Sequence, residues 1–179
     1  DPIKKEIILI VGDNVSTDQI MPAGAKILPL RSNIPAIAEF TFVQTDPEFV
    51  RRAKGKGGGF IIAGANYGQG SSREHAAIAP MYLGVAAVIA VSFARIHRSN
   101  LINFGIVPLL FNERGDHAAL ELGDQLEINA LRAAVQSGNT LKIKNLTKGT
   151  SFSVNISLTP REKAILLAGG LLNYVKVTR

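Results

Sequence analysis

The sequence predicts a compact α/β fold with a mixed, partly barrel-like β-sheet flanked by helices, and three observations lead to this prediction. The middle of the chain alternates short aliphatic runs with helix-like segments, which is typical of β-α-β units and a largely parallel sheet. Beyond Gly123 the pattern changes to short strands between Asn, Gly and Lys turns, as in antiparallel sheets. Hydrophobic residues make up 46% of the 179 residues, and no apolar run reaches the length of a membrane span.

Along the first two thirds of the chain, each element is predicted by its own local signal. An aliphatic run predicts a strand at residues 7–11, and Ser16 or Thr17 is a suitable cap for a short helix that follows. Helical patterning covers residues 32–42 and 46–54, the latter with Asp46 as cap and Pro47 in the first turn. Strands at 60–63, 86–91 and 106–111 are expected to alternate with helices at 73–83 and 93–104.

The last third predicts strands near residues 126–128, 140–143 and 152–158, followed by one helix. Thr159 is a good cap for that helix, Pro160 suits its first position, and Glu162 occupies the capping-box position. The helix is expected to end near Gly169. Because no linker is long enough to divide the chain, residues 1–179 are expected to form a single domain.

The amino-acid composition limits the kinds of catalytic and metal-binding site that the chain can form. The chain has no cysteine, so disulfides, thiol catalysis and thiolate-held metals are excluded for the chain alone, and its three histidines lack metal-ligand spacing. No metal site is therefore expected within it. The net charge of +6 favours anionic partners, and the short basic cluster at residues 51–56 is either a solvated face or a contact for nucleic acid. The first residues lack the apolar region of a signal peptide, and a cytoplasmic location is expected.

The most informative stretch is the run from Gly64 to His75, which reads Gly-Ala-Asn-Tyr-Gly-Gln-Gly-Ser-Ser-Arg-Glu-His. It links a predicted strand to a predicted helix and places Ser71, Ser72 and Arg73 in the first helical turn, where free N–H groups and the helix dipole attract anions. A plain capped turn is the alternative interpretation. The run matches neither the P-loop nor the dinucleotide-binding pattern, so spacing alone leaves the ligand open.

Four blocks carry a family resemblance: residues 12–18, 66–75, 92–101 and 105–109. Together they resemble the C-terminal swivelling domain of aconitase, which is similar to the separate small subunit of isopropylmalate isomerase and of homoaconitase. The resemblance implies a hydro-lyase in which Ser71 is the general base and Ser72, Arg73 and Arg31 bind substrate carboxylates. It further implies that Asp18 supports the site by orienting a histidine or an arginine.

The resemblance gives the two histidines near these blocks no certain chemical role. His75 is four residues after Ser71 and is expected on the same helix face. His97 is predicted to be a hydrogen-bonded structural residue.

The resemblance also implies a [4Fe–4S] cluster that activates the substrate hydroxyl. Because the chain has no cysteine, that cluster would come from other aconitase domains or from a large partner subunit, and the chain alone is expected to be inactive.

The sequence favours a tricarboxylate substrate, namely citrate and isocitrate interconverted through cis-aconitate, because Arg31 offers a cation for a third carboxylate. Gln19 stands where aconitases usually have His, and in this respect the sequence resembles the isopropylmalate isomerases. The small subunit of isopropylmalate isomerase or homoaconitase is therefore the alternative. A domain that binds RNA or regulates another protein is the alternative from a different class.

Overall fold

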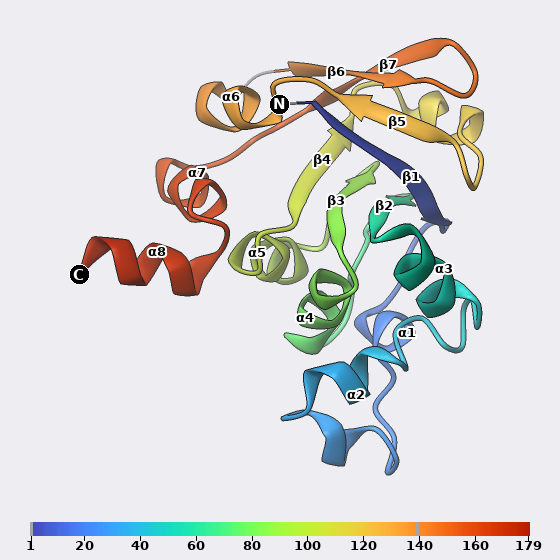
Figure 1. Ribbon diagram of the computed structural model, residues 1–179, viewed down its shortest axis with the longest axis vertical. Coiled ribbons are helices and arrows are strands. Elements are labelled where there is room, and N and C mark those ends of the chain that lie inside the picture. The colour runs from blue at the N-terminus through green and yellow to red at the C-terminus, as the bar shows by residue number, and fades with distance from the viewer. Residues whose placement is uncertain (1, 139) are drawn as a thin grey trace.

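In the computed structural model, which describes residues 2–138 and 140–179, the chain forms a closed seven-stranded β-barrel with helices on its outside (Figure 1). The strands follow one another around the barrel in the order β1-β2-β3-β4-β7-β6-β5. Their bounds are β1 Ile3–Ile10, β2 Gly59–Ala63, β3 Val85–Ala90, β4 Val107–Phe111, β5 Gln125–Ile128, β6 Thr140–Asn145 and β7 Thr150–Asn155. Strands β1 to β4 pair in parallel and the other pairs are antiparallel, which confirms the predicted fold class.

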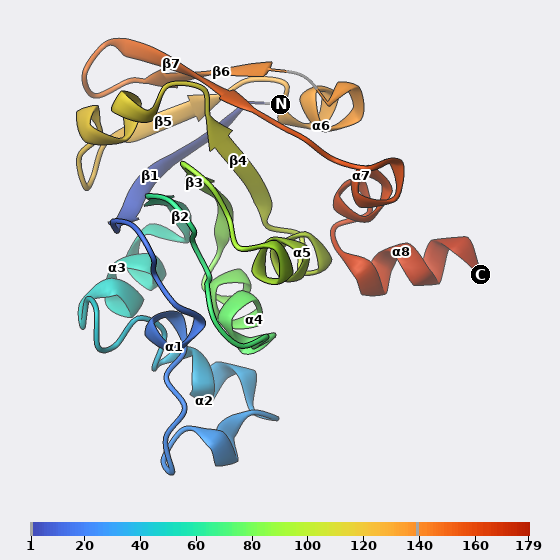
Figure 2. The ribbon, with the colours of Figure 1, turned by 180° about the vertical axis from the view of Figure 1, so that it is seen from behind.

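The helices lie mainly beside the parallel strands. Their bounds are α1 Thr17–Ile20, α2 Ile34–Ala38, α3 Phe49–Lys56, α4 His75–Tyr82, α5 Arg95–Asn103, α6 Leu131–Ser137, α7 Pro160–Leu167 and α8 Leu171–Thr178, with 3₁₀ turns at Leu28–Leu30 and Arg114–Ala119. Helices α3, α4 and α5 lie beside the parallel strands, α1 and α2 lie beyond the ends of these strands and pack on α4, and α7 and α8 extend outward past α5 (Figures 1 and 2). No described helix is long and apolar enough to cross a membrane.

The hydrophobic core has two parts because side chains on a strand alternate between its faces. Ile7, Phe60 and Ile89 belong to a cluster with members on all seven strands, which is the filling of the barrel. Their neighbours Ile8 and Ile61 belong to a second cluster, which packs against α1 to α5. Burial on both faces explains why the parallel strands are continuous aliphatic runs.

Several predicted helix ends are confirmed and others are wrong. Ser16 caps α1 in a reciprocal capping box with Gln19, and Thr159 accepts a hydrogen bond from the Glu162 N–H at the start of α7. The carboxylate of Glu162 does not complete a capping box; it pairs with Arg98 at 2.7 Å. Helix α3 begins at Phe49 rather than directly after Asp46. The Asp46 carboxylate accepts a hydrogen bond from the N–H of Glu48, the residue that precedes the helix.

The loops that follow β1, β2 and β3 meet at one end of the barrel. Parallel neighbours place their carboxyl ends on the same edge of a sheet, and this edge is where α/β proteins commonly bind ligands. Two isolated bridges join the three loops: one pairs Ser16 with Gln69, and the other pairs Tyr67 with Phe93. The sequence run with the two serines is the central loop of the three.

Candidate active site

Residues 64–74, here called the serine loop, leave β2 between the two neighbouring loops and are hydrogen-bonded to both. The Thr17 N–H donates to the Gln69 carbonyl at 2.9 Å on one side, and the Tyr67 N–H donates to the Ser92 carbonyl at 3.1 Å on the other. The Asp13 carboxylate also accepts from the Ala65 N–H at 2.7 Å. These bonds hold the loop at fixed points along its length.

Two glycines of the serine loop have conformations that a side chain would disturb. Gly68 has φ +87°, and a Cβ atom there would overlap the ring of His97. Gly70 has φ +102° and directs the chain from the bridge with Ser16 toward the serines. Positive φ is easily adopted only by glycine, so this part of the motif is explained by backbone geometry.

Ser71, Ser72 and Arg73 lie in a bend and the irregular chain that follows it, ahead of α4, which begins only at His75. The predicted helix start at residue 73 is therefore wrong, and these residues are not in a first helical turn. The hydroxyl of buried Thr17 donates to the Ser71 carbonyl at 2.8 Å and keeps this segment away from helical geometry. His75 is also not on a shared helix face with Ser71.

The Arg73 side chain is held by Asp18. Its Nη2 atom lies 2.6 Å from the Asp18 carboxylate, so the site places Asp18 beside an arginine. The Nε atom of the same guanidinium is buried and has no hydrogen-bond partner among the described residues. One nitrogen of Arg73 is thus used for positioning, while another is left for a different partner.

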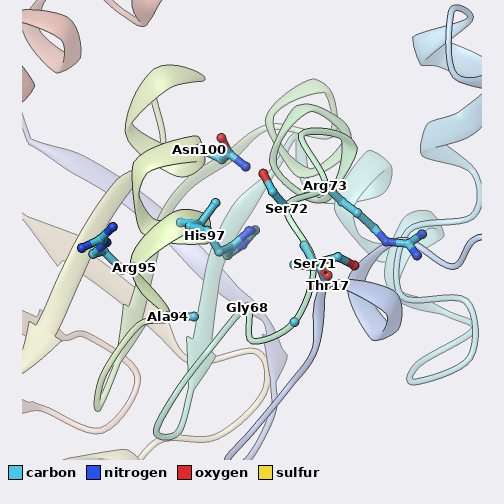
Figure 3. Close-up of a pocket in the computed structure, with 11 residues that line it drawn as sticks. Thr17, Gly68, Ser71, Ser72, Arg73, Ala94, Arg95, His97 and Asn100 are labelled. Carbon is cyan, nitrogen blue, oxygen red and sulfur yellow. Dashed lines mark hydrogen bonds between the residues drawn. The ribbon is translucent and has the colours of Figure 1, made fainter.

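A cavity of about 240 Å³ opens between the serine loop and the start of α5 (Figure 3). Ser71, Ser72 and Arg73 form one wall, and His97 and Asn100 of α5 lie on the other. The cavity is lined by Thr17, Gly68, Gly70, Ser71, Ser72, Arg73, Ala94, Arg95, Ile96, His97 and Asn100, none of which is acidic. This lining suits an anion.

The α5 wall contains buried polar atoms without partners. Both ring nitrogens of His97 and the amide Nδ2 of Asn100 make no hydrogen bond to any described residue. The prediction that the His97 side chain is hydrogen-bonded is therefore wrong as far as the described residues are concerned. Burial lowers the pKa of His97 to about 4, so its ring is neutral at pH 7.

A second cavity, of about 370 Å³, adjoins the first and shares Ser72 and Arg73 with it. Its remaining wall is mostly apolar and comprises Met21, Pro22, Ile27, Leu28 and Ile37, together with Arg31, Glu74 and His75. Arg31 is exposed at this wall, and its backbone carbonyl lies 2.7 Å from the Nε2 atom of His75. The structure thus brings Arg31, Ser72 and Arg73 to one cavity, with Ser71 and Asp18 beside it.

Sequence reasoning missed the contribution of α5. The helix itself was expected, but its cap is Ala94, whose side chain makes no hydrogen bond, so the first-turn N–H groups open onto the cavity. A signal was available: the loops after two adjacent parallel strands must meet, and residues 92–101 follow directly after β3.

The basic cluster at residues 51–56 is neutralised by acidic neighbours. Lys56 lies 3.3 Å from Glu6, and Arg52 lies 2.9 Å from Asp46. The other two cations, Arg51 and Lys54, pair with Glu48 and Glu39. This pairing favours the solvated-face interpretation over a nucleic-acid contact. Among residues 2–138 and 140–179, no three His, Asp or Glu side chains gather as metal ligands.

Comparison with known proteins gives consistent matches. The family model described as the aconitase C-terminal domain matches residues 43–114. The 3-isopropylmalate dehydratase small subunit 2 of Archaeoglobus fulgidus is 40% identical over 92% of this chain and 90% of its own length. A putative mitochondrial aconitate hydratase of Aspergillus fumigatus is 39% identical, over 64% of this chain but only 15% of its own length. The crystal structure of a 3-isopropylmalate dehydratase from Methanocaldococcus jannaschii superposes with a TM-score of 0.80 at 35% identity, covering 99% of this chain and 95% of that one.

Proposed function

The chain belongs to the family of 3-isopropylmalate dehydratase small subunits and aconitase C-terminal domains, and from that membership we propose that it is the small subunit of an isopropylmalate isomerase. Such an enzyme is a hydro-lyase: it removes water from a hydroxy-dicarboxylate and adds it back across the resulting double bond in the opposite orientation. The hydroxyl group thereby moves to the adjacent carbon. The citrate–isocitrate interpretation preferred from the sequence has weaker support than this alternative. Its named relative matches only part of this chain, whereas the small subunits match nearly all of it.

The observation that carries the proposal is the apolar cavity beside Ser72 and Arg73. Leu28, whose side chain is exposed, presents hydrocarbon surface there with Met21 and Ile27 packed behind it, which suits the branched alkyl group of isopropylmalate. A third carboxylate in the same place would need a charged partner, because an unpaired buried charge is costly. Arg31 is the cation at this wall, so a tricarboxylate would use its charge and an isopropylmalate-type substrate only its aliphatic stem.

In the proposed mechanism Ser71 removes the proton next to a substrate carboxylate, while Ser72 and Arg73 hold that carboxylate. Asp18 keeps Arg73 in place, and the free Nε of Arg73 is a charge-assisted donor for the substrate. A serine is a poor base unless its oxyanion is stabilised. The guanidinium of Arg73, which lines the same cavity, is the nearest charge for this purpose, because α4 begins only at His75 and is separated from Ser71 by three residues.

A [4Fe–4S] cluster does not fit the residues of this chain, which has no cysteine and, within its described part, no cluster of other metal ligands. We therefore assign the cluster to a large partner subunit, which would supply the Lewis acid for the substrate hydroxyl. Because iron–sulfur proteins with thiolate ligands suit a reducing compartment, we place the complex in the cytoplasm. We also propose that residues 1–179 form a single domain, since the two core clusters lie on opposite faces of the same strands β1, β2 and β3.

The test is reconstitution with the large subunit. We expect the mixture to interconvert 2- and 3-isopropylmalate, and either chain alone to be inactive. Ser71→Ala should lower kcat by at least roughly 100-fold, as loss of a general base does, while Ser151→Ala on β7 leaves it unchanged. Turnover of isopropylmalate by the single chain, or full activity of Ser71→Ala, would contradict the proposal.

Arg31→Leu separates the two substrate series in the same complex. For an isopropylmalate enzyme the substitution keeps hydrocarbon at the wall, and kcat/KM for isopropylmalate should change less than about threefold. For a tricarboxylate enzyme it removes a charged partner and should lower kcat/KM for citrate by roughly 100-fold. Arg114→Leu, on an exposed 3₁₀ turn outside both cavities, is the matched control.

A further inference from the structure

The wall of the first cavity formed by α5 is built like a binding surface, although no role has been assigned to it. His97 is 2% exposed and neither of its ring nitrogens has a partner in the described structure, and the same holds for Nδ2 of Asn100. A buried donor without a hydrogen-bond partner is destabilising, because it has lost its bonds to water and gained none from the protein. Side chains left in this state beside a cavity indicate a partner that joins them from the cavity.

The His97 side chain in this wall is closely packed. Gly68 lets the His97 ring pack directly on the serine loop, and the Tyr67 ring meets it edge-on with centroids 5.4 Å apart. In Figure 3 the ring of His97 and the amide of Asn100 point from α5 toward the serines, and Arg73 lies on the far side of those serines. The donors of Asn100 and of Arg73 therefore stand on opposite sides of Ser71 and Ser72.

The chemistry of the wall indicates an anionic group. The first-turn N–H groups of α5 open onto the cavity, Ala94 does not cap them, and the nine-residue helix directs the positive end of its dipole there. Asn100 adds an amide donor, neutral His97 adds one ring N–H, and the lining contains no Asp or Glu. A carboxylate can accept all of these bonds.

We propose that the first turn of α5, together with His97 and Asn100, binds the second carboxylate of the substrate. The first carboxylate then lies on Ser72 and Arg73, the alkyl group lies in the apolar cavity, and Ser71 stands between the two carboxylates. The identity of this carboxylate rests on the proposed function; binding of an anion at this wall does not. A site of this kind recognises hydroxy acids with two carboxylates and discriminates against those with one.

Asn100→Asp tests the proposal in the reconstituted complex, because it keeps the shape of the side chain and places a negative charge where the carboxylate should bind. We expect KM for 3-isopropylmalate to rise at least tenfold. Asn103→Asp is the matched control: it adds the same charge to the same helix but lies outside this cavity, and KM should stay within about twofold. Equal KM values for the two variants would overturn the proposal.

A binding measurement on the chain with native sequence gives a second readout that needs neither turnover nor a stable variant. Malate, which has two carboxylates, should shift the side-chain NMR resonances of Asn100 and His97, and lactate, which has one, should shift them at least tenfold more weakly at equal concentration. Equal shifts from both acids, or none at 50 mM, would show that water satisfies these atoms and would overturn the proposal. If malate shifts these resonances but the complex does not convert isopropylmalate, the subsite stands and the proposed function fails.

Discussion

The carboxylate of Asp18 lies 2.6 Å from Nη2 of Arg73, and this ion pair links the loop after β1 to the loop after β2. The Asp18 side chain is 63% exposed, whereas Arg73 is largely covered. An exposed ion pair of this kind contributes only about 0–1 kcal/mol to stability. Its effect is on the direction of the guanidinium, whose Nε is left free beside the serines.

Asp18→Asn should therefore impair substrate binding more than folding. We expect KM of the reconstituted enzyme to rise roughly tenfold, because Arg73 loses its orientation, with the free energy of unfolding changed by less than about 1 kcal/mol. Glu48→Gln, which breaks another exposed ion pair with Arg51, is the control and should alter neither quantity. A large loss of stability with unchanged KM would reverse this assignment.

Thr17→Val should displace Ser71. The substitution keeps the size of the side chain but removes the hydroxyl that donates to the Ser71 carbonyl, at a cost of about 1 kcal/mol in the free energy of unfolding. We expect kcat to fall at least roughly tenfold, because the serine loses its fixed position. Thr41→Val removes an equally buried hydroxyl, bonded to the Ala38 carbonyl, and should cost similar stability with unchanged kcat. Equal kcat values for the Thr17→Val and Thr41→Val variants would contradict the role of Thr17.

Gly68→Ala should destabilise the fold more than its backbone conformation explains. The new methyl group meets the His97 ring, so overpacking of about 1–3 kcal/mol adds to the cost of positive φ. Gly149 has a similar φ of +70°, and no atom lies within 4 Å of the position that a methyl group would take there, so Gly149→Ala isolates the backbone cost. Urea unfolding of both variants measures the difference, which should be at least about 1 kcal/mol.

The buried ring of His97 should make stability depend on pH. Its pKa is about 4 in the folded chain and about 6.5 when unfolded, so between these values the unfolded chain binds the extra proton. Stability therefore falls as the pH is lowered from 6.5 toward 4. His97→Phe removes this contribution, and the stability of the native-sequence chain relative to the variant should decline from pH 7 to pH 5. A constant difference across that range would show that His97 does not carry the effect.

The fold was largely predictable from the sequence because its strongest signals are local. The aliphatic runs of β2, β3 and β4 are buried on both faces, and the caps at Ser16 and Thr159 act within one helical turn. Helices α6 and α8 were not predicted. α6 has no side-chain cap and only seven residues, and α8 follows two glycines and buries none of its residues, so neither has a clear start signal.

The residues of the site were predictable as a group, but their geometry was not. The run from residue 64 to residue 75 indicated an anion site, yet its serines lie outside the helix because a hydroxyl 54 residues away holds the Ser71 carbonyl. The roles of Asn100 and His97 depend on which nitrogens lack partners, and that depends on the packing of three loops. A pattern of residue types does not contain this information.

The bridges that join Ser16 to Gln69 and Tyr67 to Phe93 have a consequence for how enzymes of this family are assembled. Because every anchor of the serine loop described above lies within this one chain, a covalent tether to the cluster-bearing part would change only the local concentration at which the two parts meet. The same unit can then serve as a free subunit or as the end of a longer polypeptide. Joining the two parts in one gene, or separating them into two genes, then requires no change in the serine loop.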